Sequence, residues 1–321
     1  MNQVSICVVG VGRWGLNHVK TLLSMNISVG CVDNESKRLE KIQMLFPDVV
    51  CFLSLEESFS ENFHGYIIAT PPASHADLAK QVIAKHMPLL VEKPLSLSAS
   101  DSKEIKSHLI KYNGKLLVGH LMLFHPAIQK IKKMINEGKI GKIQYIYSNR
   151  LNLGTVRTEE NVFWSFAPHD ISLFQFFTNS FPSEVISVGG DILQQNIQDT
   201  TITYLKYPNN IQGHIYVSWL HPFKEHRLVV IGSKGSIHFE DSAKDSDMSF
   251  FEKDKFDSKN PIFLKNKVSQ KIQYDSISPL ENELRHFIKI INNEVEGNGN
   301  IDEGIDVVKI LEMATKSLKS N

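Results

Sequence analysis

The chain has 321 residues, which is too long for one typical hydrophobic core and predicts two domains. Hydrophobic residues make up 42% and charged residues 22%, the balance of an ordinary soluble globular protein. Lysine plus arginine and aspartate plus glutamate are equal at 35 each, so no overall charge attracts nucleic acid or a membrane surface. Any anionic ligand must therefore be bound by local groups.

The three cysteines indicate a reducing environment. Cys7, Cys31 and Cys51 fall in apolar, strand-like stretches and have neither metal-binding nor redox spacing. They are interpreted as buried thiols of a cytoplasmic protein, and no metal site is predicted. The first residues show no basic region followed by an apolar stretch, so no signal peptide is expected. No apolar run is long enough to cross a membrane.

The first part of the chain alternates between strand-like and helix-like segments. The predicted strands are residues 4–9, 27–32, 49–52, 65–69, 89–92 and 115–119. The predicted helices include residues 16–23, 35–46 and 98–111. Such alternation predicts a parallel, doubly wound α/β sheet.

A glycine-rich turn separates the first predicted strand from the first predicted helix. Its residues Gly10, Gly12 and Gly15 have the G-x-G-x-x-G spacing of a dinucleotide-binding turn. The first glycine permits a tight turn, the second lets the backbone approach a pyrophosphate, and the third lets the helix pack on the strand. Arg13 and Trp14 lie in the same turn, at a helix N-terminus that offers N–H groups to phosphates.

Asp33 ends the second predicted strand. An acid at this distance past the glycines fits the acceptor for the ribose hydroxyls of a dinucleotide. A carboxylate here repels a 2′-phosphate, and the following Asn34 is not basic, so NAD is favoured over NADP. The alternative is that Asp33 caps the helix predicted at residues 35–46.

Two prolines end the fourth predicted strand. Thr70, Pro71 and Pro72 are expected to form a rigid loop under the nicotinamide-ribose end of the cofactor site. His75 follows in the first turn of the next helix. His75 is predicted to be one of the residues of the cofactor site. Its position on a helix favours a structural role over a catalytic one.

The apolar run at residues 89–91 is followed by Glu92, Lys93 and Pro94. This pattern is typical of a buried parallel strand. Ligands of open α/β sheets lie just outside the carboxyl ends of the strands, so Lys93 is expected where a cofactor and a substrate meet. Taken alone, the pattern also fits a surface lysine after a strand.

These motifs together resemble the Gfo/Idh/MocA family, which includes glucose–fructose oxidoreductase and inositol dehydrogenase. The resemblance rests on residues 10–15, on the sequence at residues 69–75 and above all on Glu92-Lys93-Pro94. It implies an NAD-binding Rossmann domain at residues 1–122. It also implies that Lys93 contacts both the nicotinamide and the reacting sugar hydroxyl, with its charge stabilised by Glu92, and that the Lys93–Pro94 bond is cis.

Residues 123–321 are predicted to form a second, substrate-binding α+β domain with a largely antiparallel, open-faced sheet. The predicted strands are residues 143–149, 185–189, 200–205, 212–219, 228–231 and 236–239. The predicted helices are residues 121–136, 168–177, 281–291 and 302–318. As in the family, the free face of the sheet is expected to pair subunits into a homodimer or homotetramer.

A second chemical centre is predicted at residues 161–170. The family often carries an Asp, three other residues and then a His here, opening a helix. His169 fits the histidine, which contacts the hydroxyl being oxidised, but Ser165 replaces the aspartate. Asp170 either compensates for that replacement or caps the helix, and Trp164 is placed in the same substrate site. A histidine at this point can also be purely structural.

The stretches around Arg150, Asn152 and His221 resemble family members of surface-polysaccharide biosynthesis, which act on nucleotide-linked amino sugars or sugar acids. Arg150 and His221, with Lys224 and Arg227, could bind a diphosphate or a carboxylate. The alternative is that these side chains form a solvated edge of the sheet.

The sequence therefore predicts an NAD-dependent dehydrogenase in polysaccharide or glycoconjugate biosynthesis. It would oxidise a secondary hydroxyl, at C3, of a nucleotide-activated N-acetylhexosamine or its uronic acid. Lys93 would lower the pKa of the hydroxyl and His169 would act as general base. Two alternatives stay open: a dehydrogenase of free sugars or inositols, and a non-catalytic NAD-dependent sensor or scaffold.

Overall fold

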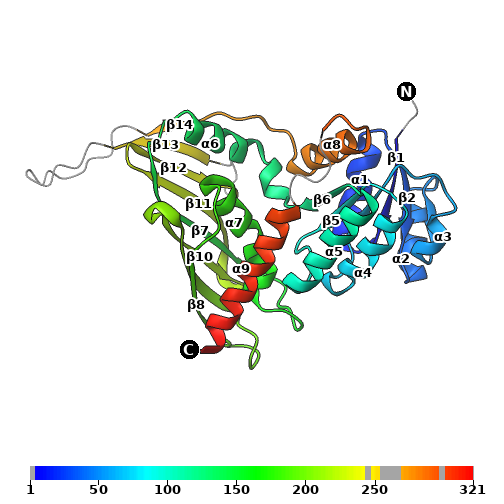
Figure 1. Cartoon of the computed structure of the whole chain (residues 1–321), viewed down its shortest axis with the longest axis horizontal. Helices are drawn as coiled ribbons and strands as arrows, with labels where there is room; N and C mark the ends of the chain where they lie inside the picture. The colour runs from blue at the N-terminus through cyan, green and yellow to red at the C-terminus, as the bar shows by residue number, and fades with distance from the viewer. Residues whose placement is uncertain (1–3, 243–246, 254–268, 296–300, 321) are drawn as a thin grey trace, which may run out of the picture. The chain divides into compact units, whose positions relative to one another are not determined.

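The computed structural model describes residues 4–242, 247–253, 269–295 and 301–320, and it divides the chain into two compact units (Figure 1). Unit 1 contains the chain up to Phe124 together with Ser278–Val308. Unit 2 contains His125–Ile277 and the chain from Lys309 onward.

Unit 1 is built on a parallel sheet. Among the described residues it has six strands in the order β3-β2-β1-β4-β5-β6, so the predicted doubly wound parallel sheet is confirmed. The strands are β1 (Ser5–Val9), β2 (Ser28–Val32), β3 (Val50–Phe52), β4 (Gly65–Ile68), β5 (Leu89–Glu92) and β6 (Leu116–Gly119). The helices that connect them are α1 (Arg13–Ser24), α2 (Ser36–Leu45), α3 (Leu55–Ser58), η1 (Pro72–Ser74), α4 (His75–Ala84), α5 (Ala99–Tyr112) and η2 (Leu121–Phe124).

Three strands of this sheet, including β6 at its edge, are apolar because they are covered on both faces. β4, β5 and β6 are buried along their whole length, which accounts for their nearly continuous hydrophobic sequences. Short polar loops at the ends of these strands carry the side chains that can meet a ligand.

Helix α8 (Pro279–Ile291) also belongs to unit 1, although the sequence reading places all of residues 123–321 in the second domain. Its residues Leu280, Leu284 and Phe287 are buried in the same core cluster as the strands β1 and β2. An amphipathic sequence shows that a helix buries one face, but it does not show which part of the chain covers that face. Only the tertiary structure therefore shows that the chain returns to unit 1.

Unit 2 is built on a mixed sheet. Among the described residues it has eight strands in the order β14-β13-β12-β11-β7-β10-β9-β8, and every pair except β7 with β10 is antiparallel, as predicted. The strands are β7 (Ile143–Leu153), β8 (Glu184–Gly190), β9 (Thr200–Lys206), β10 (Gln212–Ser218), β11 (Leu220–Gly232), β12 (Gly235–Glu240), β13 (Asp247–Glu252) and β14 (Gln270–Lys271). The helices are α6 (Pro126–Asn136), α7 (Val162–Thr178), η3 (Pro208–Asn210) and α9 (Ile301–Ser320), the last of which is divided between the two units.

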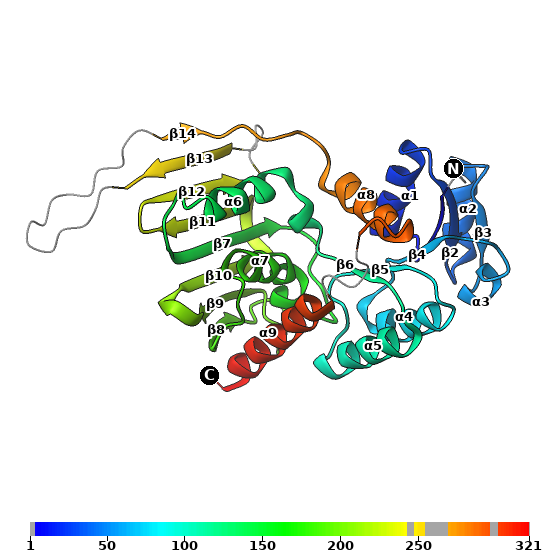
Figure 2. The same cartoon turned by 45° about the horizontal axis from the view of Figure 1, so that its top comes forward.

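The helices of unit 2 cover one face of its sheet. In both cartoon views α6, α7 and the end of α9 lie on the same side of the strands (Figures 1 and 2). Among the described residues, Ile186, Val188 and Ile202 on β8 and β9 are 43–51% exposed, which indicates that the opposite face is open.

Helix α7 begins six residues earlier than the sequence reading places it. Its cap is Asn161, whose side chain accepts from the backbone N–H of Trp164 at 3.1 Å. The predicted helix begins at Pro168, but in the structure this proline lies within the helix. Ser165 and His169 are therefore one turn apart and share a face of α7.

Candidate functional site

The glycine-rich turn of unit 1 fits the pyrophosphate of a dinucleotide. Gly10 has φ +86°, and a Cβ at this position would lie 2.7 Å from Cγ2 of Thr70. A Cβ at Gly15 would lie 1.9 Å from the carbonyl oxygen of Gly10, so α1 could not approach the turn this closely with any other residue. By contrast, no atom lies within 4 Å of a Cβ built at Gly12, which leaves room for a ligand against the backbone.

The N-terminus of α1 is available to an anion. Its N-cap residue is Gly12, so no side chain caps the first N–H groups of the helix. Arg13 and Trp14 in the first turn are both exposed. The turn therefore provides N–H donors, a positive helix end and a nearby guanidinium for phosphates.

Asp33 ties the end of β2 to the glycine-rich turn. It is only 5% exposed, and its carboxylate accepts from the backbone N–H groups of Val11 and Glu35, each at 3.0 Å. Helix α2 begins at Ser36 and its N-cap is Glu35, so Asp33 does not occupy the capping position. The carboxylate lies directly beside the turn that would hold the cofactor, as expected of a ribose acceptor.

Arg38 was missed by the sequence reading, which considered only the residue next to Asp33. Its Nη1 lies 3.4 Å from both carboxylate oxygens of Asp33, and Nη2 lies 2.8 Å from Glu35. A guanidinium at this place would attract a 2′-phosphate if the carboxylate of Asp33 were absent. The feature of the sequence that could have indicated this contact is the basic residue five positions after Asp33.

Replacing Asp33→Ala together with Asn34→Arg should shift cofactor preference toward NADP. The change removes the carboxylate that repels a 2′-phosphate and releases Arg38 to bind it. The ratio of NADPH to NADH affinity should rise about tenfold or more, which corresponds to about 1.4 kcal/mol. The affinities can be measured from the fluorescence of the bound reduced cofactors. Adding Arg38→Ala as a control should remove most of the gain, and a wild-type chain that already prefers NADPH would contradict the assignment.

Glu92 clamps helix α1 to the strand end that carries Lys93. Its carboxylate is 7% exposed; Oε1 accepts from Nε1 of Trp14 and contacts Nε2 of His18 at 2.8 Å, and Oε2 accepts from the N–H of Lys93 at 3.2 Å. Burial by itself would raise the pKa of Glu92, but the hydrogen bonds from His18 and Trp14 and the charge of Lys93 hold it below its ordinary value. The Lys93–Pro94 bond is cis, as the family resemblance implied.

His18 was not singled out from the sequence. It lies four residues after Trp14, so both side chains project from one face of α1, and this spacing was the available signal. Glu92 was expected to act on the charge of Lys93. The structure shows that its carboxylate also holds α1 in place, which links the phosphate-binding helix to the Lys93 loop.

Two further ionisable groups lie buried in unit 1. Glu283 on α8 is fully buried, and its carboxyl oxygens have no hydrogen-bond partner among the described residues. Burial and the nearby charge of Glu92 raise the pKa of Glu283 well above its ordinary value, which favours the protonated form. His120 is 1% exposed, and burial lowers its pKa to about 4 against the opposing effect of Glu92. His120 is therefore neutral at neutral pH.

Glu283→Gln should stabilise the protein at alkaline pH and have little effect in acid. The folded state keeps the proton of Glu283 to higher pH than the unfolded chain does. The free energy of unfolding of the wild type therefore falls by about 1.4 kcal/mol for each pH unit above the ordinary glutamate pKa of about 4.3, until the buried carboxyl ionises. Glutamine carries no such proton, so this loss is absent in the variant.

Urea denaturation of Glu283→Gln and wild type at about pH 4 and about pH 8, on either side of the ordinary glutamate pKa, measures this difference. Glu281→Gln is the matched control, because Glu281 lies on the same helix but is partly exposed and paired with Arg285. The control should show no such gain at alkaline pH. An equal gain for Glu283→Gln at both pH values would mean that the proton of Glu283 is not responsible.

His75 joins the Thr70 loop to the Lys93 loop. It is fully buried, with Nε2 2.9 Å from the carbonyl oxygen of Thr70 and Nδ1 2.9 Å from that of Pro94. Burial lowers its pKa, although both carbonyl groups act in the opposite direction. A buried histidine whose two ring nitrogens each lie beside a backbone carbonyl oxygen supports a structural role. The hydroxyl of Thr70 is also held, by Ser74 at 2.7 Å, so this proline-containing loop is rigid.

In unit 2, the structure brings Asp170 and Arg150 together as a buried ion pair. Asp170 is 2% exposed, and its two oxygens accept from Nε of Arg150 at 2.8 Å and from Nη2 at 3.2 Å. Asp170 is the middle residue of α7 and does not cap the helix, which corrects one of the two interpretations offered from the sequence. The guanidinium of Arg150 is bonded within the protein on two of its nitrogens.

The remaining predicted residues lie in α7 and near the ends of β7 and β11. Ser165 and His169 are partly exposed on one face of α7, and Trp164 donates from Nε1 to the hydroxyl of Thr315 at 2.8 Å. Leu220 pairs with Leu153, so Asn152 and His221 lie at the same end of neighbouring strands.

The four cationic side chains proposed to bind a diphosphate are not equivalent. Arg227 lies 3.3 Å from Glu240 and 3.5 Å from Glu225, so it is paired, as Arg150 is. Lys224 is exposed and His221 is partly exposed, with Nδ1 3.1 Å from the carbonyl oxygen of Phe223. The side chain of Arg227 is still 40% exposed, so it differs from Lys224 and His221 in its ion pairs and not in its burial.

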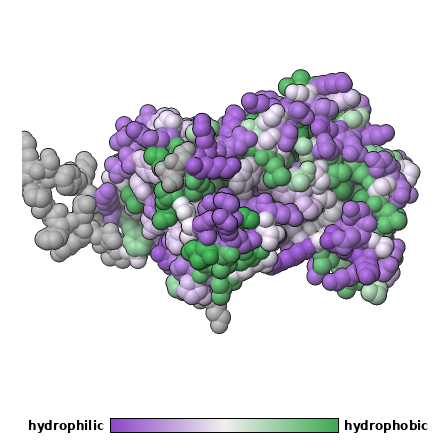
Figure 3. Space-filling view, turned by 90° about the horizontal axis from the view of Figure 1, so that it is seen from below, coloured by the Kyte–Doolittle hydropathy of each residue, from purple (hydrophilic) through white to green (hydrophobic). Residues whose placement is uncertain are grey.

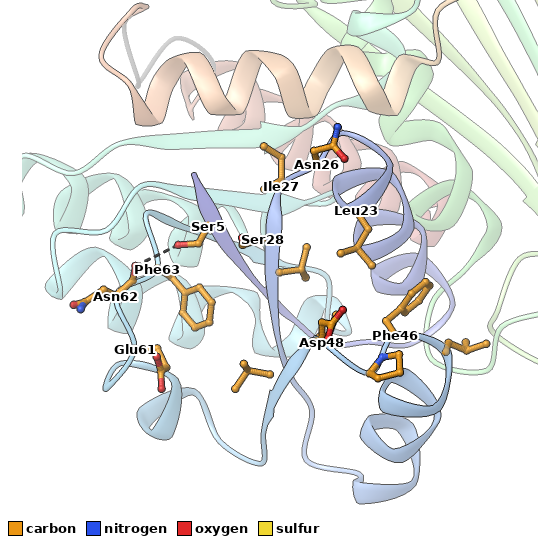
Figure 4. A pocket seen from close by; sticks show the side chains of 15 residues that line it. Ser5, Leu23, Asn26, Ile27, Ser28, Phe46, Asp48, Glu61, Asn62 and Phe63 are labelled. Carbon is orange, nitrogen blue, oxygen red and sulfur yellow. Dashed lines mark hydrogen bonds between the residues drawn. The ribbon is translucent and has the colours of Figure 1, made fainter. Parts of the chain in front are cut away.

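A hollow of about 730 Å³ lies on the other side of unit 1 (Figure 4). It is lined by Ser5 and Ser28, which begin β1 and β2, and by Phe46, Asp48 and Phe63. It therefore opens at the amino ends of the strands, opposite the edge that carries the glycine-rich turn and Lys93. This hollow is separate from the cofactor site.

In the part of the chain that the structure describes, no helix combines the length and the apolar character needed to span a membrane. Within the same residues, no group of three or more His, Cys, Asp or Glu side chains could hold a metal ion.

The turn at residues 10–15, Asp33 and Lys93 at one edge of a parallel sheet define an NAD-binding oxidoreductase. A family model described as the oxidoreductase family with an NAD-binding Rossmann fold matches residues 4–120, and the GFO/IDH/MocA C-terminal domain matches residues 128–238. The chain belongs to the Gfo/Idh/MocA oxidoreductase family, and its cofactor is NAD.

Several characterised proteins are similar to the chain. The scyllo-inositol 2-dehydrogenase (NAD(+)) of Bacillus subtilis is 26% identical over 262 residues, covering 74% of this chain and 73% of the relative. The UDP-N-acetylglucosamine 3-dehydrogenase of Acidithiobacillus ferrooxidans is 24% identical over 188 residues, covering 57% and 56%. Its crystal structure matches with a TM-score of 0.86 at 17% identity, over 100% of this chain and 99% of the other. GenD2 of gentamicin A biosynthesis, solved with NAD, matches with a TM-score of 0.82 at 18% identity, over 99% and 95%.

Proposed function

We propose that the chain is an NAD-dependent dehydrogenase that oxidises a secondary hydroxyl of a sugar. The observation that carries this proposal is Lys93, held by Glu92 at the carboxyl end of β5 in the unit whose glycine-rich turn fits NAD. The ammonium group of Lys93 lowers the pKa of the substrate hydroxyl, and His169 takes the proton as general base. NAD, when bound, accepts the hydride.

The first candidate substrate is a nucleotide-activated N-acetylhexosamine or its uronic acid, oxidised at C3. The exposed side chains of Lys224 and His221 support it, because they could bind the diphosphate. The sequence similarity to a UDP-N-acetylglucosamine 3-dehydrogenase also favours it. The ketone formed would suit a later transamination in the synthesis of a surface polysaccharide or glycoconjugate.

The second candidate substrate is a free sugar or an inositol. The ion pairs of Arg150 with Asp170 and of Arg227 with Glu240 favour it, because they engage two of the four cations that a diphosphate would need. The similarity to scyllo-inositol 2-dehydrogenase points the same way. A non-catalytic NAD-dependent sensor remains the third possibility, which Ser165 favours because it replaces the aspartate common in the family.

The absorbance of NADH after mixing the protein and NAD with single substrates tests all three. UDP-N-acetylglucosamine and its uronic acid represent the first class, and scyllo-inositol, myo-inositol and N-acetylglucosamine represent the second. Activity with the nucleotide sugars, inhibited by UDP, supports the first candidate. Activity with inositols that UDP does not inhibit supports the second. NAD binding without turnover of any substrate contradicts the proposal of a dehydrogenase for these classes and leaves the sensor.

We also propose that the chain forms a homodimer or homotetramer through the open face of the sheet in unit 2. This face carries the exposed Ile186, Val188 and Ile202, and in its middle the rings of Tyr147 and His214 stack with their centroids 5.2 Å apart. Elsewhere hydrophobic patches also interrupt the hydrophilic surface, as Figure 3 shows. Contact between two copies would remove these apolar and aromatic side chains from water.

Ile202→Glu should therefore dissociate the assembly into monomers without unfolding the chain, because a charge in an apolar interface is costly to bury. Light scattering after size-exclusion chromatography gives the mass of each species. Ile110→Glu is a matched control, because Ile110 is 73% exposed on α5 in unit 1. A wild-type chain that is monomeric at all concentrations would contradict the proposed assembly.

A further inference from the structure

Two of the three cysteines lie side by side in unit 1, although 19 residues separate them in the sequence. Cys31 on β2 and Cys51 on β3 are direct partners in the parallel ladder, so their side chains leave the sheet on the same face. Neighbouring strands are about 4.8 Å apart, which lies inside the range of about 4.4–6.8 Å between the Cα atoms of a disulfide. The ladder therefore places the two thiols within reach of one another.

The two thiols differ in environment. Cys31 is fully buried, whereas Cys51 is partly exposed on a three-residue strand at the edge of the sheet. Interaction with Cys51 and burial raise the pKa of Cys31, and interaction with Cys31 lowers the pKa of Cys51. The thiol of Cys51 donates to the carbonyl oxygen of Val49 at 3.8 Å, and no other hydrogen bond of this thiol is seen among the described residues. Cys51 is thus the thiol that an oxidant can reach and the one of the two with the lowered pKa.

We propose that Cys31 and Cys51 are a reversible redox pair that controls cofactor binding. The thiolate of Cys51 attacks a peroxide oxygen, which forms a sulfenic acid at Cys51 and releases hydroxide, or water once protonated. The sulfur of Cys31 then displaces the sulfenic oxygen as a second water, and a Cys31–Cys51 disulfide forms. In sum, two thiols and one hydrogen peroxide give one disulfide and two waters, and a dithiol reductant reverses the change.

The disulfide would form beside the residue that binds the ribose of NAD. Asp33 lies two residues after Cys31, and its backbone N–H donates to the carbonyl oxygen of Phe52, which follows Cys51, at 3.2 Å. A disulfide holds the two Cβ atoms about 3.8 Å apart, so the ends of β2 and β3 that carry the cysteines adjust when it forms. This adjustment changes the hydrogen bond that holds Asp33, and NAD should bind less tightly.

The full-length wild-type chain is the material for the test. After brief exposure to hydrogen peroxide and removal of the oxidant, the intact mass should fall by two hydrogen atoms, and the thiols open to alkylation after unfolding should drop from three to one. Peptide mapping should identify the Cys31–Cys51 link. The affinity for NADH, measured by fluorescence, should fall about tenfold, which is typical of coupling between two sites, and dithiothreitol should restore it.

Three variants distinguish oxidation of the Cys31–Cys51 pair from oxidation of other residues. Cys7→Ser, on the neighbouring strand β1, should respond to peroxide as the wild type does, whereas Cys31→Ser and Cys51→Ser should keep their affinity for NADH. The proposal is overturned if all three wild-type thiols remain open to alkylation, or if the disulfide forms and the affinity does not change. An equal loss of affinity in Cys51→Ser also overturns it, because another residue would then be the one oxidised. The wild-type mass measurement needs no variant to fold, and no outcome depends on which sugar is the substrate.

Discussion

Lys93→Met should retain NAD binding and lose turnover by roughly a hundredfold or more, the usual scale for a positioned acid–base group. Methionine keeps the length and the apolar stem of the lysine but removes the ammonium group that acts on the substrate hydroxyl. The glycine-rich turn and Asp33 are untouched, so the cofactor should still bind. The measurements are initial rates of NADH formation and titration of the variant with NADH.

The contacts around Lys93 should allow the substitution to remove the ammonium group without changing the loop. Its backbone N–H is held by Glu92, and the carboxylate of Glu92 is in turn held by Trp14 and His18, so the loop should keep its shape in the variant. Lys85→Met is the matched control, because Lys85 lies on the surface before β5, at the other end of that strand, and should keep full activity. Near-normal turnover in Lys93→Met would remove Lys93 from the mechanism.

Asp170→Ala should destabilise unit 2 by about 3–5 kcal/mol, the usual cost of removing one partner of a buried ion pair. Arg150 is 9% exposed, and both of its bonded nitrogens face Asp170, so alanine would leave a buried guanidinium without a counter-ion. This loss of unfolding free energy is much larger than the contribution of an ion pair on the protein surface. It can be measured as a shift of the urea transition that reports on unit 2.

Two controls show whether the cost comes from the uncompensated charge. The double variant Arg150→Met with Asp170→Leu removes both charges and should recover most of the stability, because apolar side chains can replace a buried ion pair. Glu137→Ala breaks the exposed pair with Lys133 on α6 of the same unit and should cost less than about 1 kcal/mol. If Asp170→Ala lost no more than Glu137→Ala, the pair would not be the anchor between β7 and α7 that its geometry indicates.

The sequence by itself determined the architecture of unit 1 and the edge that carries its chemistry. Buried parallel strands are apolar along their whole length, and this local pattern is visible in β4, β5 and β6 without any tertiary contact. The carboxyl ends of parallel strands share one edge of the sheet, so chain order alone was enough to bring Gly10, Asp33 and Lys93 to the same side.

The helix limits in unit 2 show where local signals conflict. A proline such as Pro168 is compatible with a helix start and an asparagine such as Asn161 with a helix cap, so the local pattern allows both positions. The structure has the earlier start, where Val162, Phe163 and Ala167 are buried. This choice depends on packing, which the order of residues does not show.

Only the tertiary structure decided which distant side chains meet. Four contacts join segments that are far apart in the sequence. They are the contacts of Glu92 with α1, the approach of Glu283 on α8 to Glu92, the Arg150–Asp170 pair, and the neighbouring thiols of Cys31 and Cys51. Periodicity tells which face of an element is buried, but not which element covers it, because that depends on the order of strands in the sheet and on where later helices return. The charges and protons in the interior of this protein follow from those contacts.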